Sequence, residues 1–298
     1  MGEAQRKEHT LFEAIIERLL QISASLSVLI TLLILGILVF EAANFFTKVS
    51  IIEFFTETRW TPLFTPTHYG ILPLISGTLL VTIIALFVAI PIGLGSAIYL
   101  AEYSPEKIRR IVKPILEILA GVPTVVYGYF ALTYVTPLLQ NFFPRMIVFN
   151  ALSAGIVMGI MIIPMVSSLS EDAMLAVPRY LREGAYALGA QRHEVALQVV
   201  FPSAFSGIIA SIILAISRAI GETMIVSIAA GSTPRLTLNP LKSIQTMTGY
   251  ITQISLGEAP YGSLEYQTIF SVGLTLFILV FFVNMIGHYI TQRYWRRY

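Results

Sequence analysis

The stretch Glu183–Pro202 reads EGAYALGAQRHEVALQVVFP and interrupts a chain that is otherwise apolar enough to lie in a membrane. It carries two acids, an arginine and a histidine, so it is too polar to cross a bilayer. Apolar residues nevertheless recur at helical spacing on both sides of Gly189. The pattern predicts two short amphipathic helices that are joined at a glycine turn and ended by Pro202.

The composition of the whole chain is that of a membrane protein. Of its 298 residues, 56% are hydrophobic and only 12% are charged, and the mean hydropathy is +0.77. The net charge of +2 and the lack of a basic stripe argue against a nucleic-acid partner. There is no cysteine, and no two of the four histidines have a metal-binding spacing. The sequence therefore predicts an integral membrane protein without a metal site.

Six segments are long and apolar enough to cross a bilayer, whose core needs roughly 20 apolar residues per helix. They cover about residues 23–46, 71–101, 115–138, 147–168, 204–230 and 267–291. Thirteen of the nineteen lysines and arginines fall on the side that holds the two chain ends, and five fall on the other side. We therefore expect an all-α integral membrane protein with six transmembrane helices and both termini in the cytoplasm (N-in/C-in).

The loops divide the chain further. Residues 1–22 are expected to form a cytoplasmic N-terminal segment, and residues 23–298 a transmembrane domain. Its two large excursions are a cytoplasmic loop at 169–203 and an outer loop at 231–266. In the outer loop, Asn239-Pro240 is typical of a helix start, and five apolar residues share one helical face: Leu241, Ile244, Met247, Ile251 and Ile254. This pattern predicts either a short amphipathic helix at the outer surface or mouth, or a packing loop without a partner.

Prolines and glycines mark special points within the spans. Pro91, Pro123 and Pro164 are expected kink points. Gly155 and Gly159, four residues apart, predict close packing of the fourth span against a neighbouring helix.

Two helix starts are predicted on the cytoplasmic side. Ser104-Pro105-Glu106 combines an N-cap residue, a proline and an acid in the first turn, so the third span should begin as a cytoplasmic helix. Ser168 and Glu171 have the spacing of a capping box, which predicts a new helix where the fourth span leaves the membrane.

The sequence contains no motif for an energy source of its own. Gly93-Leu-Gly95 lacks the lysine of a phosphate-binding loop, and no hydrolase, metalloprotease or kinase signature is present. No catalytic residue is predicted. A transporter with this sequence would draw its energy from an ion gradient or from a partner chain.

An arginine and a glutamate lie inside the fifth predicted span. Arg218 falls near its middle, where an arginine costs roughly 2.5–3.5 kcal/mol on insertion scales. Glu222 follows four residues later, so in one continuous helix the two side chains would share a face and offset each other. An ion pair that only orients the helices is one interpretation. The other, which we favour, is a solute pathway, because intramembrane ionisable residues commonly mark one.

The chemistry of this pair points to an anionic solute. A guanidinium presents a planar fork of donors that suits an oxyanion such as phosphate. Ser217, Thr223 and Ser227 could add neutral donors. Glu222 would repel a phosphate dianion, so it either holds Arg218 in place, pairs with an arginine of a partner, or accepts a proton from a protonated phosphate.

The opening stretch resembles the signature loop of ABC-importer permeases, E-A-A, three residues, G, nine residues, I-x-L-P. The matches are Glu183-Gly184-Ala185, Gly189 and Val199-Val200-Phe201-Pro202, with Gly184, Val199 and Phe201 in place of alanine, isoleucine and leucine. The resemblance implies a type I ABC-importer permease fold and an elbow that docks into a cleft of a cytoplasmic ATPase. The implied ATPase-coupling residues are Glu183, Gly184, Ala185, Ala187, Leu188, Gly189, Ala190 and Pro202. Closure of two ATPase subunits on ATP would then drive alternating access.

A second resemblance narrows the solute. The run Arg218-Ala-Ile-Gly-Glu-Thr-Met is similar to the R-A-x-G-E-T of phosphate importer permeases of the PstC type, as are the elbow and Arg59-Trp60-Thr61-Pro62. The implied solute-pathway residues are Arg218, Glu222, Thr223 and Ser217. The implied partners are a second permease subunit of the PstA type, two copies of an ATPase subunit and an external phosphate-binding protein, in the prokaryotic plasma (inner) membrane. ATP and magnesium would be held by the ATPase, and this chain would need no cofactor.

Three alternatives stay open at this point. A permease for another oxyanion (sulfate, molybdate, tungstate or a phosphonate) would share the same elbow. An ion-coupled secondary carrier would use Arg218 and Glu222 as a proton-linked site, but it predicts an inverted repeat, and the chain has no second elbow. A membrane enzyme with Glu222 as a base lacks a nucleophile, metal ligands and a second positioned acid.

Overall fold

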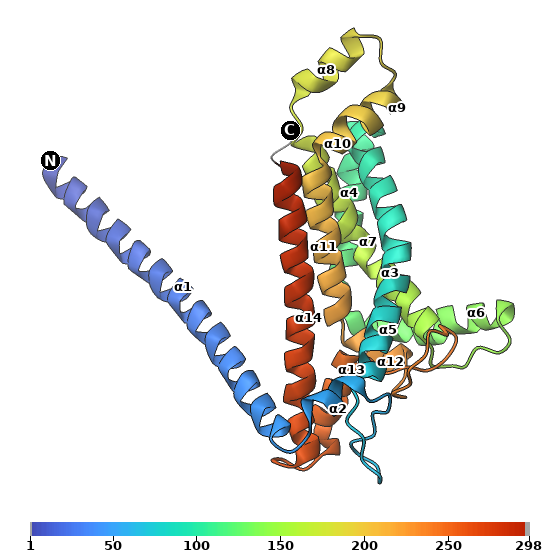
Figure 1. The fold of residues 1–298 in the computed structure, drawn as a ribbon. Helices are drawn as coiled ribbons and strands as arrows, with labels where there is room; N and C mark the ends of the chain where they lie inside the picture. The colour runs from blue at the N-terminus through green and yellow to red at the C-terminus, as the bar shows by residue number, and fades with distance from the viewer. Residues whose placement is uncertain (1, 296–298) are drawn as a thin grey trace.

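The computed structural model describes residues 2–295, and these residues fold into helices (Figure 1). Within this range no strand forms, and the only bridge is an isolated antiparallel one between Trp60 and Tyr69. Four helical segments are long and apolar enough to cross a membrane: Glu13–Phe46, Leu72–Tyr103, Ala151–Leu175 and Leu264–Arg293. Two bent helix pairs raise the number of candidate spans to six. An all-α membrane protein is therefore confirmed.

The elements follow one another along the chain as α1 (Gly2–Phe46), α2 (Ile51–Thr56), α3 (Leu72–Ile98), η1 (Tyr99–Tyr103), α4 (Glu106–Gly121), α5 (Thr124–Phe130), η2 (Ala131–Val135), α6 (Thr136–Phe142), α7 (Ala151–Leu175), α8 (Arg179–Ala187), α9 (Arg192–Glu194), η3 (Val195–Val200), α10 (Phe201–Ser203), α11 (Phe205–Gly221), α12 (Met224–Ala229), α13 (Met247–Gln253), η4 (Ile254–Glu258) and α14 (Leu264–Trp295). The η segments are π-helical. The end of the molecule that carries α8 and α9 is called the cytoplasmic end below, following the lysine and arginine bias.

The centre of the molecule is the pair α3 and α7, which make the most extensive helix–helix contact among the described elements. Glycines bring their backbones together. A Cβ added at Gly159 would lie 2.7 Å from the carbonyl oxygen of Ala85, and one at Gly93 would lie 2.8 Å from Cβ of Val166. Gly155 is equally tight against α3. The predicted packing face of the fourth span is thus confirmed, since only small residues allow such an approach.

Three clusters of buried apolar side chains surround this pair. The central cluster joins α3, α5, α7, α11 and α12, and includes Met158 and Ile162. An outer cluster gathers the end of α1, the segment after it, α13 and α14 around Trp60 and Tyr250. A cytoplasmic cluster packs the ends of α3, α7 and α11 against η3 through Met174 and Val195.

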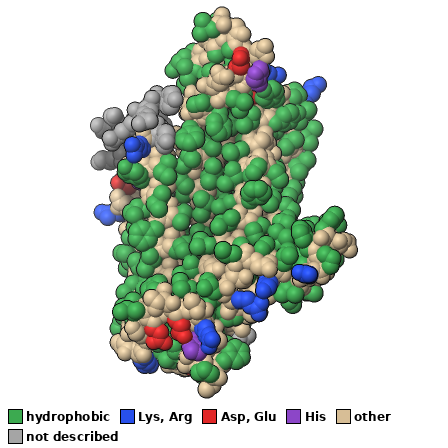
Figure 2. Space-filling view, turned by 45° about the vertical axis from the view of Figure 1, so that its right-hand side comes forward, with side chains coloured by type: hydrophobic (Ala, Val, Ile, Leu, Met, Phe, Trp, Pro, Cys, Tyr) green, Lys and Arg blue, Asp and Glu red, His purple; other side chains and the backbone are tan. Residues whose placement is uncertain are grey.

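The side chains on the surface of the molecule are apolar over its middle and include charged residues near its two ends (Figure 2). This is the distribution expected of a protein whose middle lies in hydrocarbon. Helix α1 leans away from the other spans and meets them only near its C-terminal end (Figure 1). Most of its apolar side chains are consequently exposed.

The third predicted span, 115–138, is not one straight helix. Helix α4 begins at Glu106, as the Ser104-Pro105-Glu106 motif predicted, and ends at Gly121. The chain then turns by 88° into the α5–α6 segment, which lies across the spans (Figure 1). Pro123 stands at the break, so its role as a bending point is confirmed. Pro91 and Pro164, by contrast, lie within the unbroken helices α3 and α7.

The prediction that a new helix starts at Ser168 is wrong, because α7 continues without interruption to Leu175. Glu171 does not act as a capping residue. Its buried carboxylate lies 2.6 Å from Nε of Arg109 on α4, so it makes an ion pair between two helices instead. The fourth span therefore extends beyond its predicted end at residue 168.

The predicted outer helix is shorter than expected and is not at the surface. It starts at Met247, where Thr246 Oγ1 accepts a hydrogen bond from Gly249 N at 3.1 Å, rather than at Asn239-Pro240. Met247, Tyr250 and Ile254 are buried in the outer cluster. The apolar face is thus a packing face.

The close contact between α3 and α7 makes a direct prediction. Gly159→Ala should destabilise the purified chain by about 1–3 kcal/mol, because its methyl group overlaps the Ala85 carbonyl. The matched control is Gly95→Ala on α3, where no atom lies within 4 Å; alanine there favours the helix by up to about 1 kcal/mol. Thermal unfolding in detergent measures the difference. Equal midpoints for the two variants would contradict the packing.

Candidate functional site

The fifth predicted span breaks at the charged motif. Helix α11 ends at Gly221, Glu222 adopts an extended backbone (φ −66°, ψ 132°), and α12 begins at Met224. Arg218 is therefore in the last turn of α11, whereas Glu222 lies beyond its end. The two side chains do not share a helical face and form no ion pair in the described part of the chain. The expectation that they offset each other at i, i+4 is wrong.

Glu222 instead holds the start of the next helix. Its Oε1 accepts hydrogen bonds from the backbone N–H of Met224 at 3.1 Å and of Ile225 at 3.4 Å. Its backbone carbonyl accepts from Thr248 Oγ1 at 2.7 Å, which ties the break to α13. A carboxylate at a helix N-terminus satisfies otherwise unpaired N–H groups, and so the buried acid has a structural partner.

Arg218 borders a cavity of about 300 Å³ between α4, α7 and α11. Among the described residues, Arg218 donates from Nη2 to Sδ of Met161 at 3.9 Å, a weak acceptor. Lys113 lines the same cavity, and its Nζ lies 3.0 Å from Asp172 Oδ1. The complete lining is Lys113, Leu116, Glu117, Ala120, Met161, Pro164, Met165, Ser168, Leu169 and Arg218. A guanidinium without a carboxylate partner beside a cavity is suited to an anion.

The neighbouring hydroxyls do not line this cavity. Ser217 Oγ donates to Asn284 Oδ1 on α14 at 3.2 Å. Thr223 Oγ1 donates to the Gly221 carbonyl at 3.2 Å, and Ser227 Oγ donates to the Thr223 carbonyl at 2.7 Å. Of the four predicted solute-pathway residues, the structure thus places Arg218 at the cavity, and Glu222, Thr223 and Ser217 around the helix break and α14.

The cytoplasmic stretch forms the expected elbow. Helix α8 ends in a glycine turn, with Gly189 at φ +86°, a conformation that favours glycine. Ala190 N donates to the Ala185 carbonyl at 3.1 Å and Gly189 N to the Tyr186 carbonyl at 2.9 Å, the hydrogen bonds of a Schellman motif. Helix α9 then starts from a capping box formed by Gln191 and Glu194. Two short helices joined at Gly189 are thus confirmed.

One side of the elbow is apolar and open to solvent. Leu188 at its tip is 91% exposed and Tyr180 is 68% exposed. Among the predicted coupling residues, Glu183, Gly184 and Ala187 are also exposed, whereas Ala185 and Ala190 are half-buried against the cytoplasmic cluster. Pro202 lines a groove of about 960 Å³ between the ends of α7, α8 and α11. The elbow therefore offers an apolar tip on a packed base.

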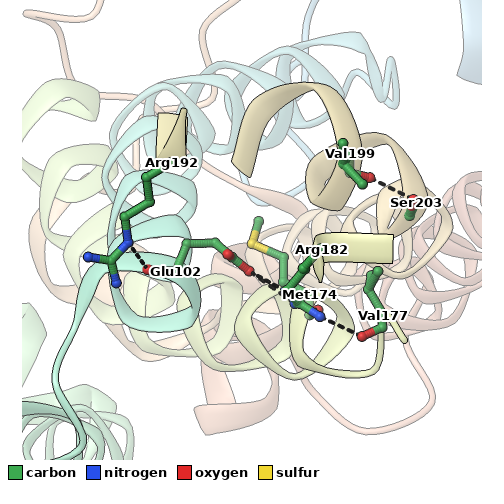
Figure 3. A network of polar contacts seen from close by, with 7 residues as sticks. All are labelled: Glu102, Met174, Val177, Arg182, Arg192, Val199 and Ser203. Atoms are coloured by element: carbon green, nitrogen blue, oxygen red, sulfur yellow. Dashed lines mark hydrogen bonds and ion pairs between the residues drawn. The ribbon is translucent and has the colours of Figure 1, made fainter. Parts of the chain in front are cut away.

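Two buried acids at this end of the molecule were not predicted as ion-pair partners. Glu102, in η1, accepts from Arg182 Nε at 3.1 Å and Nη2 at 3.0 Å (Figure 3). Glu171, in α7, pairs with Arg109. In the sequence, each of these acids lies at the end of an apolar run. Their partners Arg109 and Arg182 had been used only to assign which side of the membrane the loops face.

A family model and several relatives match the chain. Residues 89–296 match the family "Binding-protein-dependent transport system inner membrane component". The chain is 36% identical to "Probable ABC transporter permease protein YqgH" of Bacillus subtilis, over 92% of this chain and 87% of that protein. It is 34% identical to "Phosphate transport system permease protein PstC" of Xylella fastidiosa (83% and 80%) and of Haemophilus influenzae (79% and 79%).

Solved structures share the fold. The inward-facing MetNI methionine ABC transporter superposes with a TM-score of 0.58 at 19% identity, over 74% of this chain and 95% of that chain. A bacterial ABC transporter that imports the acidic polysaccharide alginate gives 0.57 at 14% identity (74% and 78%). At these identities the likeness is one of fold.

The elbow geometry makes a prediction of its own. Gly189→Ala places a side chain at positive φ, which costs about 1–2 kcal/mol. The amides of Gly189 and Ala190 should then exchange hydrogen about 5- to 30-fold faster, as measured by hydrogen–deuterium exchange. Gly184→Ala in α8 is the matched control, since no atom lies within 4 Å and the backbone is helical. Unchanged exchange in Gly189→Ala would contradict the assigned turn.

Proposed function

Because the chain belongs to the family of binding-protein-dependent transport system inner membrane components, we propose that it is a transmembrane permease subunit of an ATP-driven importer of inorganic phosphate. The proposal of phosphate as the solute rests on Arg218. This residue borders a cavity and has no carboxylate within ion-pair distance in the described residues. Several relatives named as phosphate permeases support it.

The class of the chain is not in question. It is a multi-pass permease of the bacterial inner membrane with the type I ABC-importer fold, and it is a non-catalytic membrane component. Permeases of this class assemble with ATPase subunits and an external binding protein. An ion-coupled carrier and a membrane enzyme are accordingly set aside.

The proposed mechanism assigns two tasks to this chain. The exposed tip of the elbow around Leu188 docks into a partner ATPase, which holds ATP and magnesium, while this chain holds no cofactor. Arg218 presents donors to the oxyanion when the helices open toward the outside, and the cavity beside it leads toward the cytoplasmic end past Lys113. Glu222 keeps the helix break in shape by capping α12.

The proposed assembly is asymmetric in the membrane. A second permease of the PstA type would complete the pathway, and two copies of an ATPase subunit would bind on the cytoplasmic side. Residues 1–22 and the coupling loop, which the structure shortens to 176–203, would face the ATPases. The outer loop 231–266 would receive the phosphate-loaded binding protein.

A second candidate is a permease for another oxyanion, such as sulfate, molybdate, tungstate or a phosphonate. The name of the Bacillus relative specifies no solute. A guanidinium fork also binds other tetrahedral oxyanions. Arg218 on the cavity therefore supports an oxyanion as the solute but does not distinguish phosphate from the others.

The two candidates are separated by ATP hydrolysis in proteoliposomes that contain this chain, the second permease, the ATPase and the binding protein. Phosphate, sulfate and molybdate are added in turn. Stimulation by phosphate alone is the expected result. Stimulation by another oxyanion alone would keep the architecture and overturn the solute.

The role of Arg218 gives a further prediction. Arg218→Gln should lower the phosphate uptake rate at least about tenfold, because a charge-assisted hydrogen bond to the anion is lost. Arg218→Lys should retain part of the activity, since an ammonium keeps the charge without the fork. Arg110→Gln is the control, as Arg110 is exposed on α4, where it pairs with Glu106. Normal uptake by Arg218→Gln, measured with radioactive phosphate, would contradict the assignment.

A further inference from the structure

The base of the elbow is attached to the membrane helices through one guanidinium. Arg182, on α8, donates from Nε and Nη2 to Glu102 Oε1, at 3.1 and 3.0 Å. It also donates from Nη1 to the Val177 carbonyl at 2.6 Å and from Nη2 to the Met174 carbonyl at 2.7 Å (Figure 3). The same side chain therefore joins the elbow to the end of the second span and to the C-terminal end of α7.

The second helix of the elbow, α9, contacts the backbone of Glu102. Arg192, in α9, donates from Nε to the Glu102 carbonyl at 2.8 Å. Its guanidinium also lies over the ring of Tyr103, 5.1 Å from the ring centre. Glu102 is thus held through its side chain by α8 and through its backbone by α9, on the two sides of the Gly189 turn.

The environment makes this joint stiff. The side chains of Glu102 and Arg182 are only 5% and 16% exposed, so water cannot replace either partner easily. Removing one partner of a buried pair leaves a charge without compensation. The tip of the elbow, by contrast, is open, with Leu188 almost fully exposed. A displacement of the tip would consequently be transmitted to η1 and α7 through the contact between Glu102 and Arg182.

We propose that Glu102 is a positioning residue that transmits the displacement of the elbow to the α3–α7 pair. The second span continues from α3 into η1 without a break, and α3 is packed closely against α7. Without the Glu102 carboxylate, Arg182 keeps its contacts to the end of α7, but α8 is no longer tied to the second span. This inference rests on the proposed docking of an ATPase at the elbow, and it holds for any oxyanion solute.

The test measures how much phosphate is taken up per ATP hydrolysed by the complete complex in proteoliposomes. Glu102→Gln keeps the size of the side chain but removes its charge, so uptake per ATP should fall about tenfold or more while ATP hydrolysis persists. Glu106→Gln is the matched control. It makes the same change four residues later, where the glutamate is exposed and pairs only with Arg110.

The ratio distinguishes transmission from a merely structural role, because loss of folded complex lowers uptake and hydrolysis together. An unchanged ratio in assembled Glu102→Gln would overturn the proposal. If that variant fails to assemble, Arg182→Lys decides, since it keeps the positive charge but removes the two-donor contact with the Glu102 carboxylate. A lowered ratio supports transmission and an unchanged one overturns it. A wild-type complex without ATP-driven phosphate uptake would instead refute the proposed function.

Discussion

Close packing between α3 and α7 is the constraint on which the rest of the structure depends. Glycines at 93, 155 and 159 let the two backbones meet, and any larger side chain there would overlap the opposite helix. In a bilayer such contacts replace the hydrophobic effect as the source of helix association. Helix α7 also carries Met161 beside Arg218 and ends at the carbonyls that bind Arg182. One rigid pair therefore connects the cavity to the elbow.

Buried charged residues have ion-pair partners at the cytoplasmic end of the molecule, whereas Arg218 at the cavity has none among the described residues. At the cytoplasmic end the buried acids Glu102 and Glu171 are each matched by an arginine, so the cost of desolvation is offset by ion pairs that fix the ends of helices. At the cavity Arg218 has no such partner, because α11 ends before Glu222 and that carboxylate caps α12. The paired charges thus fix helix ends, whereas Arg218 has no carboxylate within ion-pair distance among the described residues.

Much of the fold follows from the sequence. Hydropathy located the four segments that form straight candidate spans, and the spacing around Gly189 predicted the elbow, because both signals are local. Only one of the two helix breaks could be predicted from the sequence, the one at Pro123. The break at Glu222 depends on backbone N–H groups and on Thr248, 26 residues away. Glu102 escaped notice since its partner Arg182 is 80 residues distant. Arg218 could be singled out from the sequence, whereas Lys113 is brought to the same cavity only by the fold.

The central claim is that the elbow and the α3–α7 pair move as one body. The chain has no cysteine, so spin labels can be placed at Tyr180→Cys on α8 of the elbow, away from the docking tip, and Ile83→Cys on the exposed face of α3. Electron paramagnetic resonance then gives the distance between the labels in the assembled complex, with and without bound ATP. The account predicts one narrow distance distribution that is the same in both states. A shift or a broadening when ATP binds would show that the elbow moves independently, and would contradict it.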